Sequence, residues 1–380
     1  MQQTPQYKTP GQLIQDLLDK RDWTQRVLAT ILDVNETGIN KIIAGKQPLG
    51  AELALALSKI FNVPAETFLE LQNSYELAQA RILTRADPDM DNRAHLFGSL
   101  PVAEMIKRGW LDTDDIRDYA KVEQALIRFF NARSVEEIEI FPHAAKKTKV
   151  VGDVTPVQLA WLYRVREIAS EMLVQRYSHK AVLEATAKLK PLLASPDATR
   201  KVPRILAECG IRYVIVEALT GSNIDGVCFW LDEESPVIGM TLRFDRIDNF
   251  WFVLRHELEH VIQIHGRFAA MMDTELEGER VETGSGITDE ERVANGAAAE
   301  FCVPQKSLQG FISRKAPFCR EQDVIGFART LQVHPGLVAG QLQHKLKRYD
   351  RFRNHLVKIR SAIAPSAVVD GWGDVAPVGM

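Results

Sequence analysis

Apolar residues recur every three or four positions along the first 78 residues, and this spacing predicts short amphipathic helices. Five are expected: one opened by Pro10, one capped by Thr24, one capped by Asn35, one over Ala51–Phe61 and one from Ala65. Short helices joined by tight turns are typical of a helix-turn-helix arrangement. We therefore expect a five-helix domain of this kind over residues 8–78.

The pattern stays helical through residues 79–200, which are interpreted as a helical linker or docking region. Three helical stretches are expected there, at 102–107, 113–131 and 157–188. Farther along, β-branched runs predict three strands, at 210–216, 226–231 and 236–242. The last two flank the acidic turn Asp232–Ser235, so the fold class that follows is α+β: mainly α with a small antiparallel sheet.

A basic stretch follows residue 345. From Lys345 to Arg360, seven Lys or Arg residues face the single acid Asp350 on a helical pattern. Residues 346–380 are therefore expected to form a basic helix and a flexible tail rich in Ala, Pro and Gly. The helix could contact nucleic acid, or it could be an ordinary solvated amphipathic helix.

Composition excludes several classes of protein. No run of eighteen apolar residues is present, so no membrane span is expected. The first residues lack the apolar core of a signal peptide. The four cysteines form no C-x-x-C pair, and buried thiols in a reducing cytoplasm are expected. The net charge of −3 gives no overall signature of nucleic-acid binding.

The third predicted helix has the chemistry of a DNA reader. Its amides and charged groups could bond base edges, and neighbouring cations could hold phosphates. The candidate DNA-binding residues are Gln25, Arg26, Asn35, Glu36, Thr37, Asn40, Lys41 and Lys46. From Lys20 to Pro48, however, five basic residues face three acids, so a helical protein-docking module remains an alternative.

Three landmarks carry a family resemblance in this segment: the Gln25-x-x-x-Ala29 spacing, Ala44-Gly45-Lys46 and the closing Phe68–Gln72. With them, the segment resembles the Cro/C1-type (XRE) helix-turn-helix, and most of all the HigA family of antitoxins. The resemblance implies an operator DNA partner, a homodimer on palindromic sites and, for an antitoxin, a cognate toxin. Asp33 departs from the pattern, because that turn often has Gly.

The motif H-E-x-x-H lies in Trp251–Gly266, a stretch whose apolar spacing predicts a helix. Residues four apart share a helix face, so His256 and His260 could bind one Zn²⁺. Glu257 could then take a proton from water as the catalytic base of a zinc peptidase. The alternative is an ordinary amphipathic helix that carries two histidines.

A hydrolytic zinc site needs a third protein ligand and one open position. His265 is not spaced for that role, and the Gly and His that a metzincin requires are missing. An acid on a later helix is the remaining option, and Thr288 caps such a helix, with acids in its first turn.

The H-E-x-x-H motif, the E-x-x-A-N segment Glu291–Asn295 and Pro304 together resemble the ImmA/IrrE family of zinc metallo-endopeptidases. The resemblance covers about residues 205–345 of a predicted domain at 201–345, and it implies a zincin-like domain with Glu291 as the third ligand. The adjacent Glu290 is the alternative register.

Together these observations predict a DNA-binding transcriptional regulator fused to a zinc endopeptidase that cleaves a repressor or antitoxin-type protein. The alternative is a non-catalytic, HigA-like antitoxin or transcription factor whose metal domain senses or docks.

Overall fold

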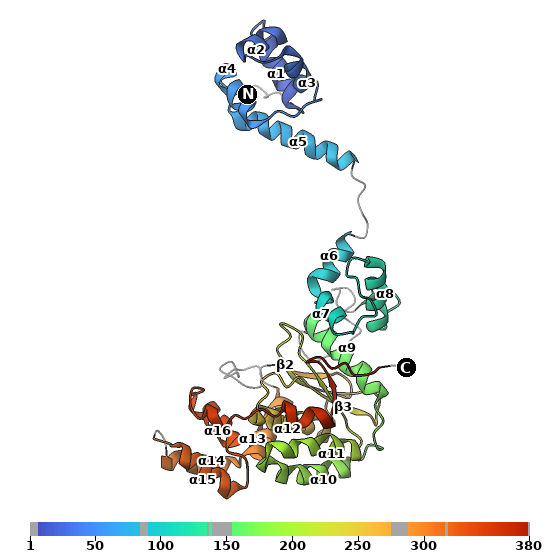
Figure 1. The fold of residues 1–380 in the computed structure, drawn as a ribbon, viewed down its shortest axis with the longest axis vertical. Coiled ribbons are helices and arrows are strands. Elements are labelled where there is room, and N and C mark those ends of the chain that lie inside the picture. Colours follow the sequence, from blue (N-terminus) through green and yellow to red (C-terminus); the bar gives the residue numbers. More distant parts are fainter. Residues whose placement is uncertain are drawn as a thin grey trace. The chain divides into compact units, whose positions relative to one another are not determined.

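The computed structural model describes residues 7–83, 90–134, 137–138, 154–274, 288–315 and 318–378. Its backbone contacts divide the chain into two compact units, Met1–Met90 and Asp91–Met380 (Figure 1). Each unit has its own buried core, and each is described by itself.

Unit 1 contains the five predicted helices, α1 (Pro10–Asp19), α2 (Gln25–Ile31), α3 (Glu36–Ile43), α4 (Ala51–Phe61) and α5 (Ala65–Leu83). The caps that define two of them are the predicted ones: Thr24 Oγ1 accepts from Val27 N at 3.3 Å, and Asn35 Oδ1 accepts from Thr37 N at 2.8 Å. A small core of Leu18, Leu28, Leu57 and Phe68 joins the helices.

The turn between α2 and α3 keeps a glycine-like conformation. Asp33 has a φ of 52°, in the left-handed region that Gly adopts most easily. Aspartate is among the few residues that tolerate this region, so the substitution for Gly leaves the turn between the two helices intact.

Unit 2 is built from many short helices around one sheet. Its α-helices are α6 (Met90–Ser99), α7 (Val102–Lys107), α8 (Tyr119–Phe129), α9 (Pro156–Glu171), α10 (His179–Leu189), α11 (Val202–Glu208), α12 (Ile247–Ile262), α13 (Asp289–Cys302), α14 (Gln305–Lys315), α15 (Glu321–Leu331), α16 (Pro335–Leu346) and α17 (Arg360–Ile363). Its strands are β1 (Arg212–Val216), β2 (Ile224–Trp230), β3 (Pro236–Met240), β4 (Met271–Thr274) and β5 (Val368–Asp370).

The sheet is mixed, which corrects the expected antiparallel one. Its strand order is β4-β2-β3-β1-β5, with β1 parallel to both β3 and β5. The tight turn Asp232–Ser235 makes β2 and β3 antiparallel, as predicted. The longer connection between β1 and β2 imposes no such pairing, so β3 lies between them.

Helices cover both faces of this sheet. Alternate residues of β1 point to opposite sides, with Val214 and Val216 in the core shared with α9, and Tyr213 and Ile215 in the core shared with α12. On the α9 side, Gly239 leaves room for a helix to approach, because a Cβ there would lie 2.8 Å from Val165. The predicted α+β class, mainly helical with a small sheet, is thus confirmed. The sheet is the middle one of three layers, with helices on each face.

The domain boundaries therefore differ from those predicted at 79–200 and 201–345. Helix α9, which lies in the expected linker, packs directly on the sheet through Trp161 and Val165. Trp161 Nε1 donates to the carbonyl of Val216 at 3.0 Å. The middle of the chain is part of unit 2 and not a separate spacer.

The expected basic helix over residues 346–360 is wrong. Helix α16 ends at Leu346, and Lys347 and Phe352 have φ values of 53° and 60°, which no α-helix accommodates. Buried Phe352 and Ile359 pack on the core instead. Asp245 Oδ1 accepts hydrogen bonds from the backbone N–H groups of Ile359 and Arg360 at 3.1 and 2.7 Å.

The expected flexible tail is also wrong over its described residues. Strand β5 extends the sheet beside β1, pairing Val368 with Val214 and Asp370 with Val216. The Asp370 side chain is completely buried. The sequence pattern of β5 is three residues long, which is too short to distinguish a strand from a loop by periodicity alone.

Two compositional predictions can be compared with the structure. All four cysteines are buried, as expected. Among the described residues, no helix has both the length and the apolarity that crossing a bilayer would require.

Candidate functional site

Helix α12 presents His256 and His260 on one face, as the four-residue spacing predicts. Both side chains are completely buried. Their Nε2 atoms lie 3.0 Å apart, so the two rings converge on one point. On another face of the helix, Arg255 Nη2 and Glu259 Oε2 form the expected ion pair at 2.6 Å.

Glu291 reaches the same point from α13. The N-cap is the predicted one, since Thr288 Oγ1 accepts from Glu291 N at 3.2 Å. Glu291 Oε2 lies 3.3 Å from His256 Nε2, and its Oε1 lies 3.4 Å from His260 Nε2. The structure therefore brings Glu291, and not Glu290, to the two imidazoles.

Asp273 on β4 is a fourth member that the sequence analysis did not identify. Its Oδ2 atom lies 3.1 Å from His256 Nε2 and 3.9 Å from His260 Nε2. Ligand atoms of His256, His260, Asp273 and Glu291, here called the donor cluster, all lie within 4.8 Å of one another. A weak signal was present: in a strand, Met271 and Asp273 face the same side, and an acid beside buried Met271 faces inward.

Glu257 is buried beside the donor cluster, over strand β2. The strand has Gly226 at this position, and a Cβ there would lie 2.1 Å from Glu257 Oε1. Neither carboxylate oxygen of Glu257 has a hydrogen-bond partner among the described residues. Gly226 thus makes the space that the predicted catalytic base occupies.

Burial and crowding of charge shift the pKa values of these groups in opposite directions. Burial, and then the charge of Asp273, raises the pKa of Glu257 well above its usual range. Burial opposes the charge on His256, but Asp273 and Glu291 outweigh it and raise that pKa to about 10. Burial, with the charge of His256, lowers the pKa of His260 to about 4.

A second layer of contacts orients His260. Its Nδ1 atom lies 3.0 Å from His265 Nδ1, so one ring donates a hydrogen bond to the other. His265 Nε2 lies 3.9 Å from Glu290 Oε1. A metal-binding His commonly has such an outer partner, which fixes the ring orientation. His265 and Glu290, both considered as ligands from the sequence, are positioned for this supporting role.

The donor set fits a divalent cation. Two buried carboxylates, Glu257 and Asp273, and the partly buried carboxylate of Glu291 surround two imidazoles. Burying that excess of negative charge without a counterion is costly. Two imidazole nitrogens with carboxylate oxygens form a donor set that Zn²⁺ accepts. The same donors also suit Fe²⁺ or Mn²⁺, so metal analysis must identify the ion.

Replacing Gly226 by alanine is expected to displace Glu257 and to destabilise unit 2 by about 1–3 kcal/mol, as overpacking does. The new Cβ would also lie 2.8 Å from Glu257 Cδ, so moving the carboxylate tip alone is not enough. Urea unfolding measures the effect. The matched control is Gly326→Ala in α15, where a Cβ meets nothing within 4 Å; equal midpoints for the two variants would contradict the prediction.

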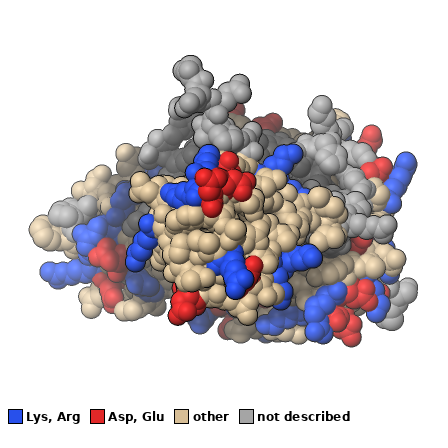
Figure 2. All heavy atoms as spheres, turned by 90° about the horizontal axis from the view of Figure 1, so that it is seen from above, with Lys and Arg blue, Asp and Glu red and all other residues tan. Residues whose placement is uncertain are grey.

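The candidate DNA-binding residues all lie in unit 1. Seven of the eight are exposed: Arg26, Asn35, Glu36, Thr37, Asn40, Lys41 and Lys46. Gln25 is half-buried, and its Nε2 donates to Gln15 Oε1 at 2.9 Å. On α3, Asn40 and Lys41 lie opposite buried Ile39 and Ile42. The face seen in Figure 2 mixes Lys and Arg with Asp and Glu.

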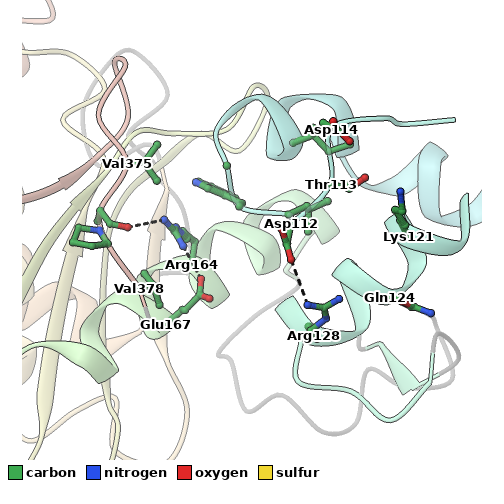
Figure 3. Close-up of a pocket in the computed structure, with 16 residues that line it drawn as sticks. Asp112, Thr113, Asp114, Lys121, Gln124, Arg128, Arg164, Glu167, Val375 and Val378 are labelled. Carbon is green, nitrogen blue, oxygen red and sulfur yellow. Dashed lines mark hydrogen bonds and ion pairs between the residues drawn. The ribbon is translucent and has the colours of Figure 1, made fainter. Parts of the chain in front are cut away.

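A separate pocket of about 960 Å³ lies in unit 2, lined by α8, α9, the loop after α7 and residues 375–378 (Figure 3). It contains none of the donor-cluster residues. Its charges are largely paired: Arg164 contacts Glu167 at 2.8 Å, and Arg128 contacts Asp112 at 3.5 Å. The pair of Arg128 and Asp112 joins α8 to the loop after α7, which indicates a structural role.

Comparison with known proteins identifies unit 1. Residues 14–68 match the family model described as Helix-turn-helix. The chain is 31% identical over 71 residues to an uncharacterised HTH-type transcriptional regulator, YddM, of Escherichia coli strain K12. The matched region covers 76% of that protein and 19% of this chain. It is 39% identical over 71 residues to virulence-associated protein A' of Dichelobacter nodosus. This matched region covers 62% of that protein, which is less than two thirds, and 18% of this chain. Through residues 14–68, the chain belongs to the helix-turn-helix family of DNA-binding proteins.

Proposed function

We propose that this chain is a transcriptional regulator in which unit 2 is a zinc-dependent endopeptidase. The proposed substrate is a protein partner of the repressor or antitoxin class, as the resemblance of about residues 205–345 to the ImmA/IrrE family implies. The observation that carries the proposal is convergence: His256 and His260 from α12 meet Glu291 from α13, with Glu257 beside them. A homodimer on a palindromic operator is proposed for unit 1.

Each of the chain's groups has a role in this chemistry. When bound by His256, His260 and Glu291, zinc supplies Lewis acidity for peptide hydrolysis. Glu257 is placed to take a proton from water and to return it to the leaving amine. A divalent cation held by these ligands would offset the repulsion among the carboxylates, and this would favour the ionised form of Glu257 that a general base requires.

A non-catalytic role is the second candidate, and one observation favours it. Asp273 brings a fourth protein donor group to the cluster, and sites with four protein ligands are usually structural. On this alternative, unit 2 is a metal-sensing or docking module of an antitoxin-like regulator, with a toxin as its partner.

The variant Glu257→Gln separates the two candidates. New protein N-termini, mapped by mass spectrometry in cells that express the wild type, should include one inside a regulatory protein. With Glu257→Gln we expect that terminus to fall by at least about 100-fold, because the proton acceptor is lost. Zinc content and operator binding of the variant should match the wild type. Identical sets of termini in both strains would support the non-catalytic role.

The DNA-reading role of α3 predicts two different losses in gel-shift titrations. Asn40→Ala should weaken binding to the chain's operator by about 1–3 kcal/mol if Asn40 reads a base. Lys41→Ala should lower the slope of log affinity against log salt by about 1, because one phosphate contact is lost. Lys59→Ala, an exposed cation on α4, is the control. Equal effects of all three variants would contradict this assignment of α3.

A further inference from the structure

The donor cluster is compact enough for a site with four protein ligands, because its ligand atoms all lie within 4.8 Å of one another. Four ligand atoms at zinc-bond lengths of about 2.0–2.1 Å stand roughly 3.3 Å apart when arranged tetrahedrally. The two histidine Nε2 atoms lie 3.0 Å from each other and 3.1 and 3.9 Å from Asp273 Oδ2. Glu291 approaches them with both oxygens, Oε2 at 3.3 Å from His256 and Oε1 at 3.4 Å from His260. Asp273 approaches His256 more closely than Glu291 does.

The position of Asp273 is set by the sheet. Strand β4 pairs with β2 in an antiparallel register that places Asp273 opposite Gly226. Because Gly226 has no side chain, the Glu257 carboxylate fits over β2 at this position. Asp273 is 6% exposed, and its Oδ2 has no hydrogen-bond partner among the described residues although it lies 3.1 Å from His256 Nε2. A buried oxygen in this situation is a candidate ligand atom.

We propose that Asp273 is a fourth protein ligand, which closes the metal centre in the folded chain. The inference rests on the proposed zinc site and adds a regulatory step to it. A hydrolytic site needs one position free for water, and Asp273 fills that position. Peptide hydrolysis then has to wait until Asp273 leaves the metal.

Strand β4 is suited to release Asp273. It is four residues long, and among the described strands it lies at the edge of the sheet, next to β2 alone. Its register with β2 is irregular between Ile224 and Gly226. A short edge strand with such an irregularity is held by few backbone hydrogen bonds, so Asp273 can be withdrawn without unfolding the rest of the sheet.

The test replaces zinc by Co²⁺ in the full-length chain and follows its visible absorption spectrum, which reports the number of ligands. Acetohydroxamate, a small anion that binds an open metal position, is then titrated in. We expect no spectral shift for the wild type and a clear shift for Asp273→Ala and Asp273→Asn. Glu257→Gln, which changes a neighbouring acid that is not a ligand, should behave as the wild type.

The outcomes separate this inference from the proposal on which it rests. A wild type that binds Co²⁺ through the histidines, but shifts with acetohydroxamate as both Asp273 variants do, overturns the fourth ligand and leaves the zinc site standing. A wild type that takes up no more Co²⁺ than His260→Ala overturns both. Asp273→Asn keeps the size of the side chain, so it can be measured even if Asp273→Ala misfolds.

Discussion

Replacing Asp370 by alanine is expected to lower the free energy of unfolding of unit 2 by about 3–5 kcal/mol, because it leaves a buried charge without its partner. Asp370 Oδ2 accepts a hydrogen bond from Arg164 Nε at 2.8 Å, and its Oδ1 accepts one from Trp110 Nε1 at 2.9 Å. Arg164 is 3% exposed. Its other partners are Glu167 and the carbonyl of Ala376, both beside the pocket in Figure 3.

Tryptophan fluorescence during urea unfolding measures this loss, since Trp23 alone of the six tryptophans lies outside unit 2. The control is Asp350→Ala, which removes an exposed ion pair with Arg348 and should leave the midpoint almost unchanged. Replacing Arg164 by Met and Asp370 by Leu together should cost less than Asp370→Ala, because no charge is then stranded. If Asp370→Ala lowered the urea midpoint no more than Asp350→Ala does, the predicted role of Asp370 would be wrong.

The second large effect is expected at the proposed metal centre, where His260→Ala should lower zinc affinity by more than about 100-fold. Loss of an outer-shell partner alone typically costs about 10–100-fold. Loss of a direct ligand removes a metal bond and leaves a cavity between α12 and the donor cluster. His265→Ala, which removes the hydrogen-bond partner of His260 at 3.0 Å, should fall in the smaller range.

Competition against a chromophoric zinc chelator, at a fixed pH, measures both affinities. The expected order is wild type, then His265→Ala, then His260→Ala. Glu257→Gln should bind zinc as the wild type does, because Glu257 is not a proposed ligand. If His260→Ala and His265→Ala bound zinc equally well, His260 would not be a direct ligand.

Unit 1 was predictable because its signals are local. Thr24 and Asn35 cap the helices that they precede in the sequence, and each helix has its own apolar spacing. Even the departure at Asp33 had a local solution, since aspartate adopts the left-handed conformation of the turn. The pairing of His256 with His260 was equally local, because one helix turn joins them.

The rest of the site depends on contacts distant in sequence. The resemblance to a peptidase family implied Glu291, and the structure places it at the histidines. Asp273 was missed because strand register, and not spacing along a helix, brings it there. Similarly, the apolar spacing of the basic segment after α16 predicts a helix, but in the structure Phe352 and Ile359 are buried on the core.

The pairing of β5 with β1 has a consequence for biosynthesis. A ribosome makes β1 at Arg212–Val216 long before it makes Val368–Asp370, so β1 must emerge with one edge uncovered and with Arg164 lacking its buried partner Asp370. Unit 1 can fold during translation, as N-terminal domains do. Unit 2 completes its sheet only after β5 has left the exit tunnel, so unit 1 matures first and unit 2 last.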